Sequence, residues 1–517
     1  MKRGWLVAVF GVALAWTQYR ESGLREIAGH LELATEPLMP ARVYLFKDGK
    51  PFRLSPVDAM LPLRVDLFYR ERLWRRGANP SVLEVTCNDI SHFFLLKGRA
   101  NFDLPAGNYR VEAYRGLFYK PFSAEFTLEA GKQTRAVLKM EDWTAGEGAK
   151  WISSDDHIHL VRDREDDAVF LSWMDAEDLT VANFLQLQRQ MDAASQYGYG
   201  PQAEAKRGGR SIRPGHESRS AFFGHVNVLG GREMIRPLSL GTVYSNSPET
   251  FPYPYVLFGM GRKLGALVGY AHFDGSQKNS ALLMDLALGN LDFAEVFQFG
   301  RLRTEQWYEL LNAGFRLTGV AGSDFPVNVN NATKLEKWSR WIPLLGPERM
   351  LVKAAAGTSA YETWAAAVKR GEGVVTNGPL IELRLNEQSG QLEAEAKFYR
   401  PMTKLEIVAN GKVIASAKAG ASLRASASIP PQGPVWVAAR ALADPDVAGT
   451  TEIQAHTNPR YMRWDGSAPD SQARRNAADR WRKEVEYYRT APLVFPSERE
   501  RARFFELCEV ALKKLTG

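Results

Sequence analysis

The stretch Asp155-Asp156-His157-Ile158-His159 decides how this sequence is interpreted. It follows the apolar pair Trp151-Ile152, which predicts the start of a strand, and it places two imidazoles two residues apart. Side chains at i and i+2 point to the same face of an extended strand, so His157 and His159 can reach one metal ion together. Five of the eight histidines fall between His157 and His272. This clustering favours a metal-dependent enzyme over a scatter of buried or surface histidines.

The central part of the chain, from residue 151 to about residue 345, alternates helical and apolar extended patterns. Tyr255–Leu264 and Glu305–Asn312 have the pattern of helices, and a glycine that suits a helix C-terminus follows each of them. Ala266–Ala271 and Phe315–Val320 then have the pattern of buried strands. Repeated βα units imply a largely parallel sheet or a barrel, in which the chemistry collects at the C-terminal ends of the strands.

The N-terminal flank has short strands instead. From Ile27 to Met140 several segments alternate with period two, and Pro105-Ala106-Gly107-Asn108 is a hairpin-type break between two of them. Strands at this spacing with no helical period between them predict a β-sandwich.

The C-terminal flank returns to strands from about Thr376 to Tyr461, where Asn410-Gly411 is a strong hairpin signal. The charged tail from Asp470 to Gly517 predicts helices, with a break marked by Pro492 and Pro496. The mixed charges of the tail are typical of a solvated helical face.

Length and charge narrow the class of protein. A chain of 517 residues is too long for one core and suggests roughly three domains. The net charge of +7 is spread along the sequence without a lysine or arginine block. We therefore expect no nucleic-acid partner.

The first residues predict export. Lys2 and Arg3 precede an uncharged run, Trp5 to Trp16, which suits a signal peptide and is too short for a stable membrane span. A short uncleaved anchor and a buried N-terminal element are the alternatives. Periplasmic or extracellular localisation is the expectation. Cys87 and Cys508 form no CxxC pair, and the sequence leaves open whether they are bridged.

The predicted strand ends of the central region each deliver a candidate metal ligand. Imidazole and carboxylate ligands without thiolates suit Zn²⁺, Mn²⁺ or Fe²⁺, and a hydrolytic site needs such ligands around an activated water. The candidate segments are Asp155 to His159, Pro214-Gly215-His216-Glu217, Gly224-His225-Val226-Asn227, Ala271-His272, Phe293 to Phe297 around Glu295, and Ala321-Gly322-Ser323-Asp324.

These segments, together with Val374-Val375-Thr376-Asn377-Gly378-Pro379, resemble the polymerase-and-histidinol-phosphatase (PHP) family in its CehA/McbA-like metallohydrolase branch. The resemblance covers roughly Trp151 to Pro379. It implies a distorted (β/α)7 barrel with one or two divalent metal ions at the strand ends. The segment around Pro105 also resembles carboxypeptidase-regulatory-like accessory sandwiches of exported enzymes. Carried over by position, the implied metal ligands are His157, His159, Glu217, His225, His272 and Asp324, with Glu217 as the bridge.

Two departures from the family pattern reduce the expected number of metals. An Asp-His pair after the first helix is replaced by Glu177-Asp178, and a final Asp-x-His is replaced by Asp324-Phe325-Pro326. We therefore expect one or two metal ions and not three, with Glu177 or Asp178 as substitute ligands. A degenerate site that binds metal poorly remains the alternative.

Other roles compete with ligation at several positions. Asp324 also suits a helix N-cap, and Glu217 also suits a plain ion pair with nearby arginines. His216 points away from Glu217 if the segment is extended, so it is left out of the site. Glu295 is expected to orient a histidine, and Asp178 or Glu295 to shuttle a proton.

The glycine- and arginine-rich segment Ser195–Arg219 has two interpretations. It is either a solvated loop or a basic lid beside Glu217 that admits an anionic substrate. Under the second interpretation, Arg162, Arg213 and Arg219 bind the substrate, which we expect to be a small molecule.

The expected organisation is a multidomain α/β and β protein. Residues 1–16 are an export signal or short anchor, 25–142 a β-sandwich accessory domain, 150–375 the PHP-like barrel, 376–465 a second β-sandwich-like domain and 466–517 a helical tail. The expected function is metal-dependent hydrolysis of an ester, amide, carbamate or phosphoester bond. The alternative is an exported, non-catalytic protein that binds a glycan or another protein through its sandwiches.

Overall fold

The computed structural model describes residues 28–52, 54, 74–76, 81–87, 91–188, 194–220, 222–236, 250–273, 281–326, 345–445 and 452–517. The predicted export segment, residues 1–16, lies outside these described residues. The chain is mixed α/β and rich in strands, as the sequence predicts. It divides into two compact units, the first running to Asp142 with the addition of Asp175–Glu177, and the second containing Trp143–Met174 and Asp178–Gly517. Among the described residues, no helix is long and apolar enough to cross a membrane.

The first unit contains two sheets that share one apolar core. Leu33, Val43, Leu96, Val111 and Leu138 belong to one buried cluster that draws on both sheets. One sheet has the order β10-β1-β7, and the other has the order β4-β5-β6-β2-β8-β9 with β3 beside β2. The strands are β1 (Ala28–Glu36), β2 (Ala41–Lys47), β3 (Lys50–Phe52), β4 (Trp74–Arg76), β5 (Val82–Cys87), β6 (Ser91–Leu96), β7 (Arg99–Pro105), β8 (Gly107–Tyr114), β9 (Phe122–Leu128) and β10 (Gln133–Lys139).

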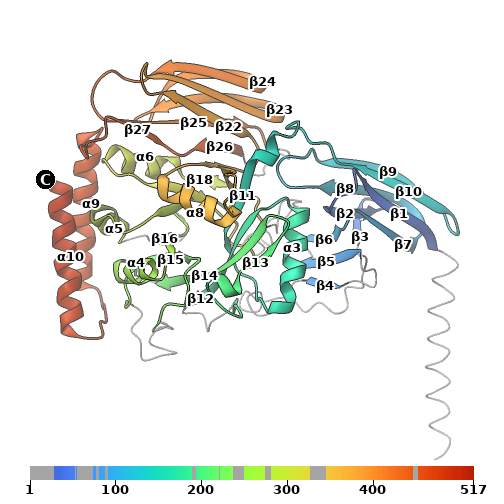
Figure 1. Ribbon diagram of the computed structural model, residues 1–517, viewed down its shortest axis with the longest axis horizontal. Helices are drawn as coiled ribbons and strands as arrows, with labels where there is room; N and C mark the ends of the chain where they lie inside the picture. The colour runs from blue at the N-terminus through green and yellow to red at the C-terminus, as the bar shows by residue number, and fades with distance from the viewer. Residues whose placement is uncertain are drawn as a thin grey trace, which may run out of the picture. The chain divides into compact units, whose positions relative to one another are not determined.

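The second unit is built on a sheet that begins with the histidine-bearing strand (Figure 1). Its first strands pair in parallel, the middle strands are antiparallel, and the last strands are parallel again. In spatial order these strands are β11 (Trp151–Ile158), β12 (Val181–Gln188), β14 (Arg210–Ser220), β15 (Gly224–Leu229), β16 (Leu267–Tyr270), β17 (Phe293–Gln298) and β19 (Thr318–Ala321). The short strands β13 (Ala205–Arg207) and β18 (Arg301–Leu302) form hairpins with β14 and β17.

The two ends of this strand series approach each other without forming a ladder. Ile158, at the end of β11, forms an isolated parallel bridge with Phe325, and the amide of His159 donates to the Phe325 carbonyl at 2.6 Å. Among the described residues, no closed barrel is shown. The bridge nevertheless joins the end of β11 to the segment after β19, which brings the candidate ligands of both ends together.

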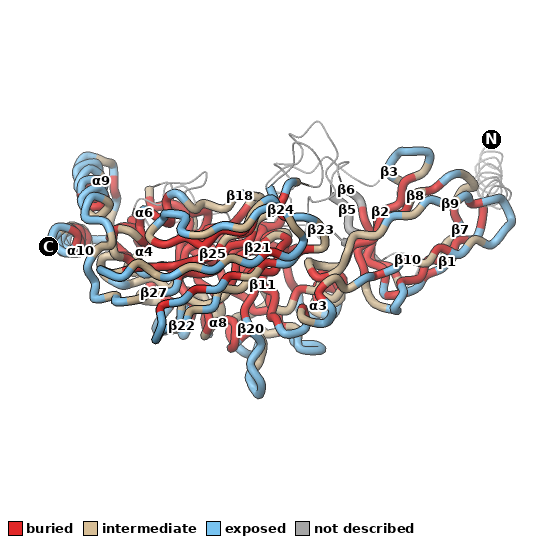
Figure 2. Tube along the Cα trace, turned by 90° about the horizontal axis from the view of Figure 1, so that it is seen from above, coloured by how far each residue is buried: buried red, intermediate tan, exposed pale blue. Residues whose placement is uncertain are grey.

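Short helices alternate with the strands of this sheet, and several of them pack against it. The helix α8 (Ala360–Arg370) buries Tyr361, Trp364 and Val368 against the sheet, with Ser359 as an N-cap that accepts from the Glu362 amide. The other helices are α3 (Asp167–Ala176), α4 (Pro254–Lys263), α5 (Leu282–Leu288) and α6 (Thr304–Asn312). In Figure 2 the central strands of this unit are mostly drawn as buried.

The C-terminal strands continue the same sheet. β20 (Arg349–Lys353) pairs with β11 and β21 (Val374–Thr376), and β21 in turn pairs with β26 (Ile453–Thr457). The predicted hairpin at Asn410-Gly411 is confirmed, because both residues have positive φ (46° and 80°) and join two long strands. The remaining strands are β22 (Leu380–Asn386), β23 (Gln391–Ala409), β24 (Lys412–Ser428), β25 (Val435–Ala443) and β27 (Arg460–Met462).

The tail forms two helices that lie side by side, α9 (Ser471–Thr490) and α10 (Glu498–Thr516) (Figure 1). The break between them falls at the two predicted prolines. Their outer faces are charged and exposed, as predicted, but their inner faces bury Trp481 and Phe504 in the largest apolar cluster of the second unit.

Within the segment Ser195–Arg219, predicted as a solvated loop or a lid, residues 195–204 contain no strand, but residues 205–220 form the β13–β14 hairpin. β14 is almost entirely buried. Arg213 pairs with Glu204 at 3.0 Å, and its guanidinium lies 4.3 Å from the ring centroid of Tyr361. A counter-ion and an aromatic face offset the cost of burying an arginine. Counting arginines in the sequence could not show these partners.

Candidate metal centre

The structure brings all six predicted ligands together in the second unit. His157 lies on β11 and His159 directly follows it, while Glu217 lies on β14 and His225 on the neighbouring strand β15. His272 follows β16 and Asp324 follows β19, so each side chain stands on or just beyond a strand. All six residues are buried. Six ionisable side chains without bulk water need a compensating partner, and a metal ion is one that suits imidazole and carboxylate groups.

The first ligand group consists of His157, His159 and Asp324, with Glu217 beside them. The two Nε2 atoms of the histidines are 2.9 Å apart, and Asp324 Oδ1 lies 3.4 Å from the first and 3.2 Å from the second. Glu217 Oε2 lies 3.3 Å from His159 Nε2, and its Oε1 lies 3.7 Å from His157 Nε2. Ligand atoms about 2.0–2.1 Å from a tetrahedral zinc ion stand about 3.3 Å from one another. The observed spacings lie around that value.

The second ligand group consists of Glu217, His225 and His272. Glu217 Oε1 lies 2.8 Å from His225 Nδ1 and 3.2 Å from His272 Nε2. The two oxygens of Glu217 therefore face different histidines, which is the arrangement that a bridging carboxylate requires. Three protein ligands leave a coordination position for water, as in catalytic zinc sites.

Three of the four histidines are held by acceptors on their second ring nitrogen. The Nδ1 atom of His159 lies 2.7 Å from the Leu185 carbonyl, and that of His272 lies 2.5 Å from Gln298 Oε1. The Nδ1 atom of His157 lies 3.0 Å from Glu295 Oε1. A protonated Nδ1 that donates to these groups leaves Nε2 unprotonated and directed at the ligand cluster. The histidines thus have the surroundings of metal ligands.

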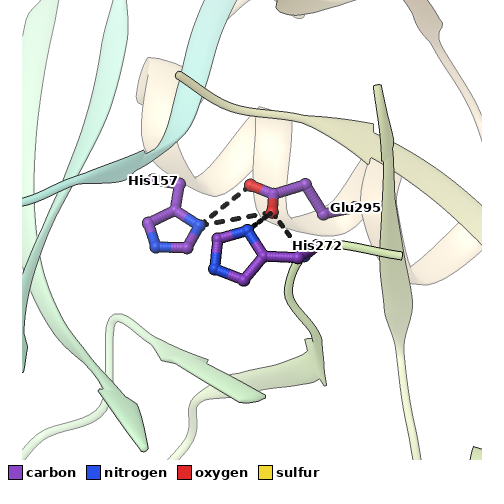
Figure 3. Close-up of side chains that lie close together, drawn as sticks. All are labelled: His157, His272 and Glu295. Carbon is purple, nitrogen blue, oxygen red and sulfur yellow. Dashed lines mark hydrogen bonds and ion pairs between the residues drawn. The ribbon is translucent and has the colours of Figure 1, made fainter. Parts of the chain in front are cut away.

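The carboxylate of Glu295 contacts two of these histidines, His157 and His272 (Figure 3). Besides contacting His157, its Oε2 accepts from the backbone amide of His272 at 2.9 Å. Burial raises the pKa of Glu295 to about 8. A nearby divalent cation stabilises the ionised form of a carboxyl group, so a bound metal would favour Glu295 as the acceptor for His157. This contact is the one that the predicted orienting role requires.

The protein groups of the centre shift one another's pKa values strongly. Burial acts to lower the pKa of His159 and of His272, but contacts with Asp324 and Glu217 outweigh it and raise both values to about 9. Burial lowers the pKa of His157 to about 3 and that of His225 to about 4. For Glu217, burial opposes ionisation, but Arg219 and His225 outweigh it and hold the pKa well below its usual range. The centre therefore combines an ionised carboxylate with neutral and protonated imidazoles.

Three other predicted site residues, Asp178, Arg162 and Arg213, do not join this cluster. Asp178 lies before the first residue of β12 and accepts from Arg210 Nη2 at 3.2 Å, whereas β12 approaches the centre at Leu185. Asp178 therefore lies at the opposite end of β12 from the part of this strand that contacts the centre.

Arg162 is fully buried, with Nε 2.6 Å from Asp167 Oδ1 and Nη2 2.8 Å from Tyr197 Oη. These contacts tie together neighbouring segments of the second unit, so Arg162 has a structural role. Arg213 is likewise engaged by partners outside the cluster, Glu204 and Tyr361.

Glu177, the other substitute ligand considered, forms a buried ion pair with Arg42 at 2.8 Å.

Arg219 is the predicted substrate-binding arginine that reaches the centre. Its Nε donates to Glu217 Oε2 at 2.7 Å. Glu217 therefore forms an ion pair with Arg219 and also lies among the candidate metal ligands.

Two features of the centre were not predicted. The sequence rule that polar residues end the strands could have found Gln298, because it is the last residue of β17. No side-chain pattern could have shown that the Leu185 carbonyl orients His159. His216 lies outside all of the ligand groups, and burial lowers its pKa to about 3.

In comparisons with known proteins, no family model matches this sequence, and no curated protein matches it.

Proposed function

We propose that this protein is a metal-dependent hydrolase. The observation that carries the proposal is the convergence of His157, His159, Glu217, His225, His272 and Asp324 from separate strands, with three of the histidines oriented through Nδ1. A bound divalent metal supplies a water of lowered pKa and a Lewis acid for the oxygen of the scissile bond. The bond is an ester, amide, carbamate or phosphoester.

The roles of the protein groups follow from their contacts. Glu217 holds the two ligand groups in register, because its oxygens face His159 on one side and His225 and His272 on the other. Glu295 contacts the ring of His157 and accepts a hydrogen bond from the backbone amide of His272. Once ionised, it accepts a hydrogen bond from Nδ1 of His157 and so keeps the ring proton on that nitrogen. Because the cluster is buried, bulk water is excluded from it, and only water bound at the ligand groups is present there.

The resemblance to the PHP family is part of this proposal. The series β11-β12-β14-β15-β16-β17-β19 contains seven strands and is joined at its ends by the Ile158–Phe325 bridge. This order is compatible with a distorted (β/α)7 barrel in which β15 runs antiparallel to both of its neighbours, β14 and β16. The candidate ligands then lie at the strand ends, where barrel enzymes keep their chemistry. Export to the periplasm or the cell exterior, which is expected from the first residues of the sequence, is also part of the proposal.

The donor set favours zinc, manganese or iron, and two ions fit the two ligand groups. Imidazole nitrogens dominate both groups, and no thiolate lies among them. Cys508 is buried and free, and the side chain of Cys87 lies outside the described part of the chain.

The proposal is tested by measuring metal per chain by mass spectrometry on untagged protein purified without chelators. We expect one or two equivalents of zinc, manganese or iron, and their loss in His157→Ala together with turnover of ester and phosphoester substrates. His216→Ala is the matched control, because it removes a buried histidine next to Glu217 that belongs to no ligand group. Circular dichroism and thermal unfolding establish that each variant is folded.

Absence of bound metal, and no uptake when metals are added, would overturn the proposal. In that case the exported, non-catalytic binding protein becomes the better description.

A further inference from the structure

The hairpin between β17 and β18 turns beside the second ligand group. Gln298 pairs with Arg301 in the antiparallel register, so Phe299 and Gly300 form a two-residue turn. Both turn residues have positive φ, 51° for Phe299 and 69° for Gly300. Positive φ at both positions matches the twist of a hairpin, but it is unfavourable for a side chain as bulky as phenylalanine. The backbone of this turn is therefore strained at Phe299.

The other two-residue turns between described strands avoid this strain. Their first position is occupied by aspartate, glycine or asparagine, which adopt the left-handed backbone more readily. These turns are Asp48-Gly49, Gly208-Gly209 and Asn410-Gly411. A strained residue persists where the surrounding structure holds it, and such residues concentrate at functional sites. The phenylalanine therefore points to a role other than making the turn.

The ring of Phe299 packs against a candidate metal ligand. Its centroid lies 5.9 Å from that of the His272 imidazole, and the two ring planes are 15° apart. The ring of His157 lies near the same imidazole, at 5.2 Å and 28°. Phe299 also lines a small recess together with His272, Glu295 and Gln298. A half-buried aromatic ring thus lies along the imidazole that belongs to the second ligand group.

The hydrogen bond to Gln298 does not by itself fix the orientation of His272. The contact between Nδ1 and Gln298 Oε1 at 2.5 Å holds one edge of the imidazole, and a ring held at one edge can still tilt. A nearly parallel aromatic ring opposes the tilt, because turning the imidazole loses the packing between the two rings. His272 Nε2, which lies 3.2 Å from Glu217 Oε1, then stays directed at the second ligand group.

We propose that Phe299 is a positioning residue of the candidate metal centre, and that its ring holds the His272 imidazole in the orientation that metal binding requires. The inference rests on the proposed function, because it takes the second ligand group to bind a metal ion. It adds a residue from outside the ligand set. The β17–β18 turn is strained at Phe299, and the ring that this strain places beside His272 strengthens the site.

The test replaces Phe299 with the residue that such a turn prefers. Phe299→Asn removes the ring and relieves the strain, since Asn-Gly is the favoured pair in a two-residue turn. We expect the metal-free variant to unfold at a temperature no lower than that of the wild type. Its affinity for one of the two zinc equivalents should fall by about 3- to 10-fold, the size of an aromatic contact, while the other equivalent keeps its affinity. Titration of the full-length protein with zinc against a chromophoric chelator measures both affinities.

Two further variants separate the ring from the hairpin. Phe299→Tyr keeps an aromatic ring at this position and should bind both zinc equivalents as the wild type does. Arg301→Asn is the matched control, because it changes an exposed residue of the same hairpin and should leave both affinities unchanged.

Unchanged affinity for both equivalents in Phe299→Asn would overturn the positioning role and leave the metal centre standing. An equal loss at both equivalents, with a lower unfolding temperature of the metal-free protein, would show that Phe299 only stabilises the fold, which also overturns the inference. Wild-type protein that binds no zinc would overturn the proposed function, and this inference with it.

Discussion

Two histidines of the candidate centre have pKa values that favour the protonated ring, so a metal ion that bound there would have to displace a proton from each. The carboxylates of Asp324 and Glu217 raise the pKa of His159 and His272 to about 9 against the effect of burial. Because these values lie above the ordinary value of about 6.5, both rings are protonated at neutral pH when only protein groups surround them. Their contribution to stability is then complete below about pH 6.5 and is lost as the pH rises through about 9.

Metal affinity should show the opposite trend. Each of the two ligand groups contains one of these protonated rings, so each metal must release about one proton near neutral pH. We expect the apparent affinity of each group for zinc to rise about tenfold per pH unit between pH 6.5 and 8.5. Calorimetric titration in two buffers of different ionisation enthalpy measures both the affinity and the proton release. An affinity that stays constant over this range would contradict the proposed ligands.

At the scale of residues, the sequence predicted the ligand cluster better than its surroundings. Strand-end histidines and acids are visible in the sequence because a polar residue that ends an apolar run is unusual. Which arginine reaches the centre is not visible, since Arg162, Arg213 and Arg219 look alike until their partners are known. The partners, Asp167, Glu204 and Glu217, come from the tertiary structure.

At the scale of elements, β19 is held by the side chain of Asn458, which lies between β26 and β27. Asn458 Oδ1 accepts from the Gly319 amide at 2.7 Å, and its Nδ2 donates to the Gly319 carbonyl at 3.0 Å. Gly319 lies in the middle of β19, the strand that leads to Asp324. Asn458 is buried, so water cannot replace these hydrogen bonds easily.

Asn458→Ala should therefore lower the free energy of unfolding by about 2–4 kcal/mol, since it leaves a buried amide and a buried carbonyl without their partner. Denaturant unfolding followed by tryptophan fluorescence measures the change. Asn476→Ala is the matched control, because Asn476 is exposed on α9 and its loss should change stability by less than about 0.5 kcal/mol. Equal midpoints for the two variants would contradict a structural role for Asn458.

The helix signals and the hairpin signal at Asn410-Gly411 were reliable, whereas the break at Pro105–Asn108 is no hairpin, because it joins β7 and β8, which lie in different sheets. Helices expected at 255–264 and 305–312 are found at Pro254–Lys263 and Thr304–Asn312, each followed by a glycine with positive φ. β14 was missed because its apolar residues are few and its arginines suggested solvent. The buried partners that make this strand possible are distant in sequence, and a local pattern does not contain them.

At the scale of the whole molecule, the second unit is the one that we expect to respond to metal. It contains all of the candidate ligands, a continuous sheet and a shared apolar core, whereas the first unit has a core of its own. A ligand that binds only the folded form stabilises the unit that holds its site.

In scanning calorimetry, we expect metal to raise the unfolding temperature of one transition, that of the second unit, and chelator to lower it. At a free metal concentration about 100 times the dissociation constant, the stabilisation is about 2.7 kcal/mol. In His157→Ala the transition should not respond to metal. A shift of every transition by the same amount would show that the two units unfold together.

No short segment of the chain contains the candidate centre. Its ligands are distributed over five strands between His157 and Asp324, and the bridge that completes it, from Ile158 to Phe325, spans the same interval. Of the six candidate ligands, only His157 and His159 are close together in the sequence. The full site exists only after β19 has joined the sheet. If the centre binds a metal ion, we therefore expect the metals available where folding finishes to determine which ion it holds.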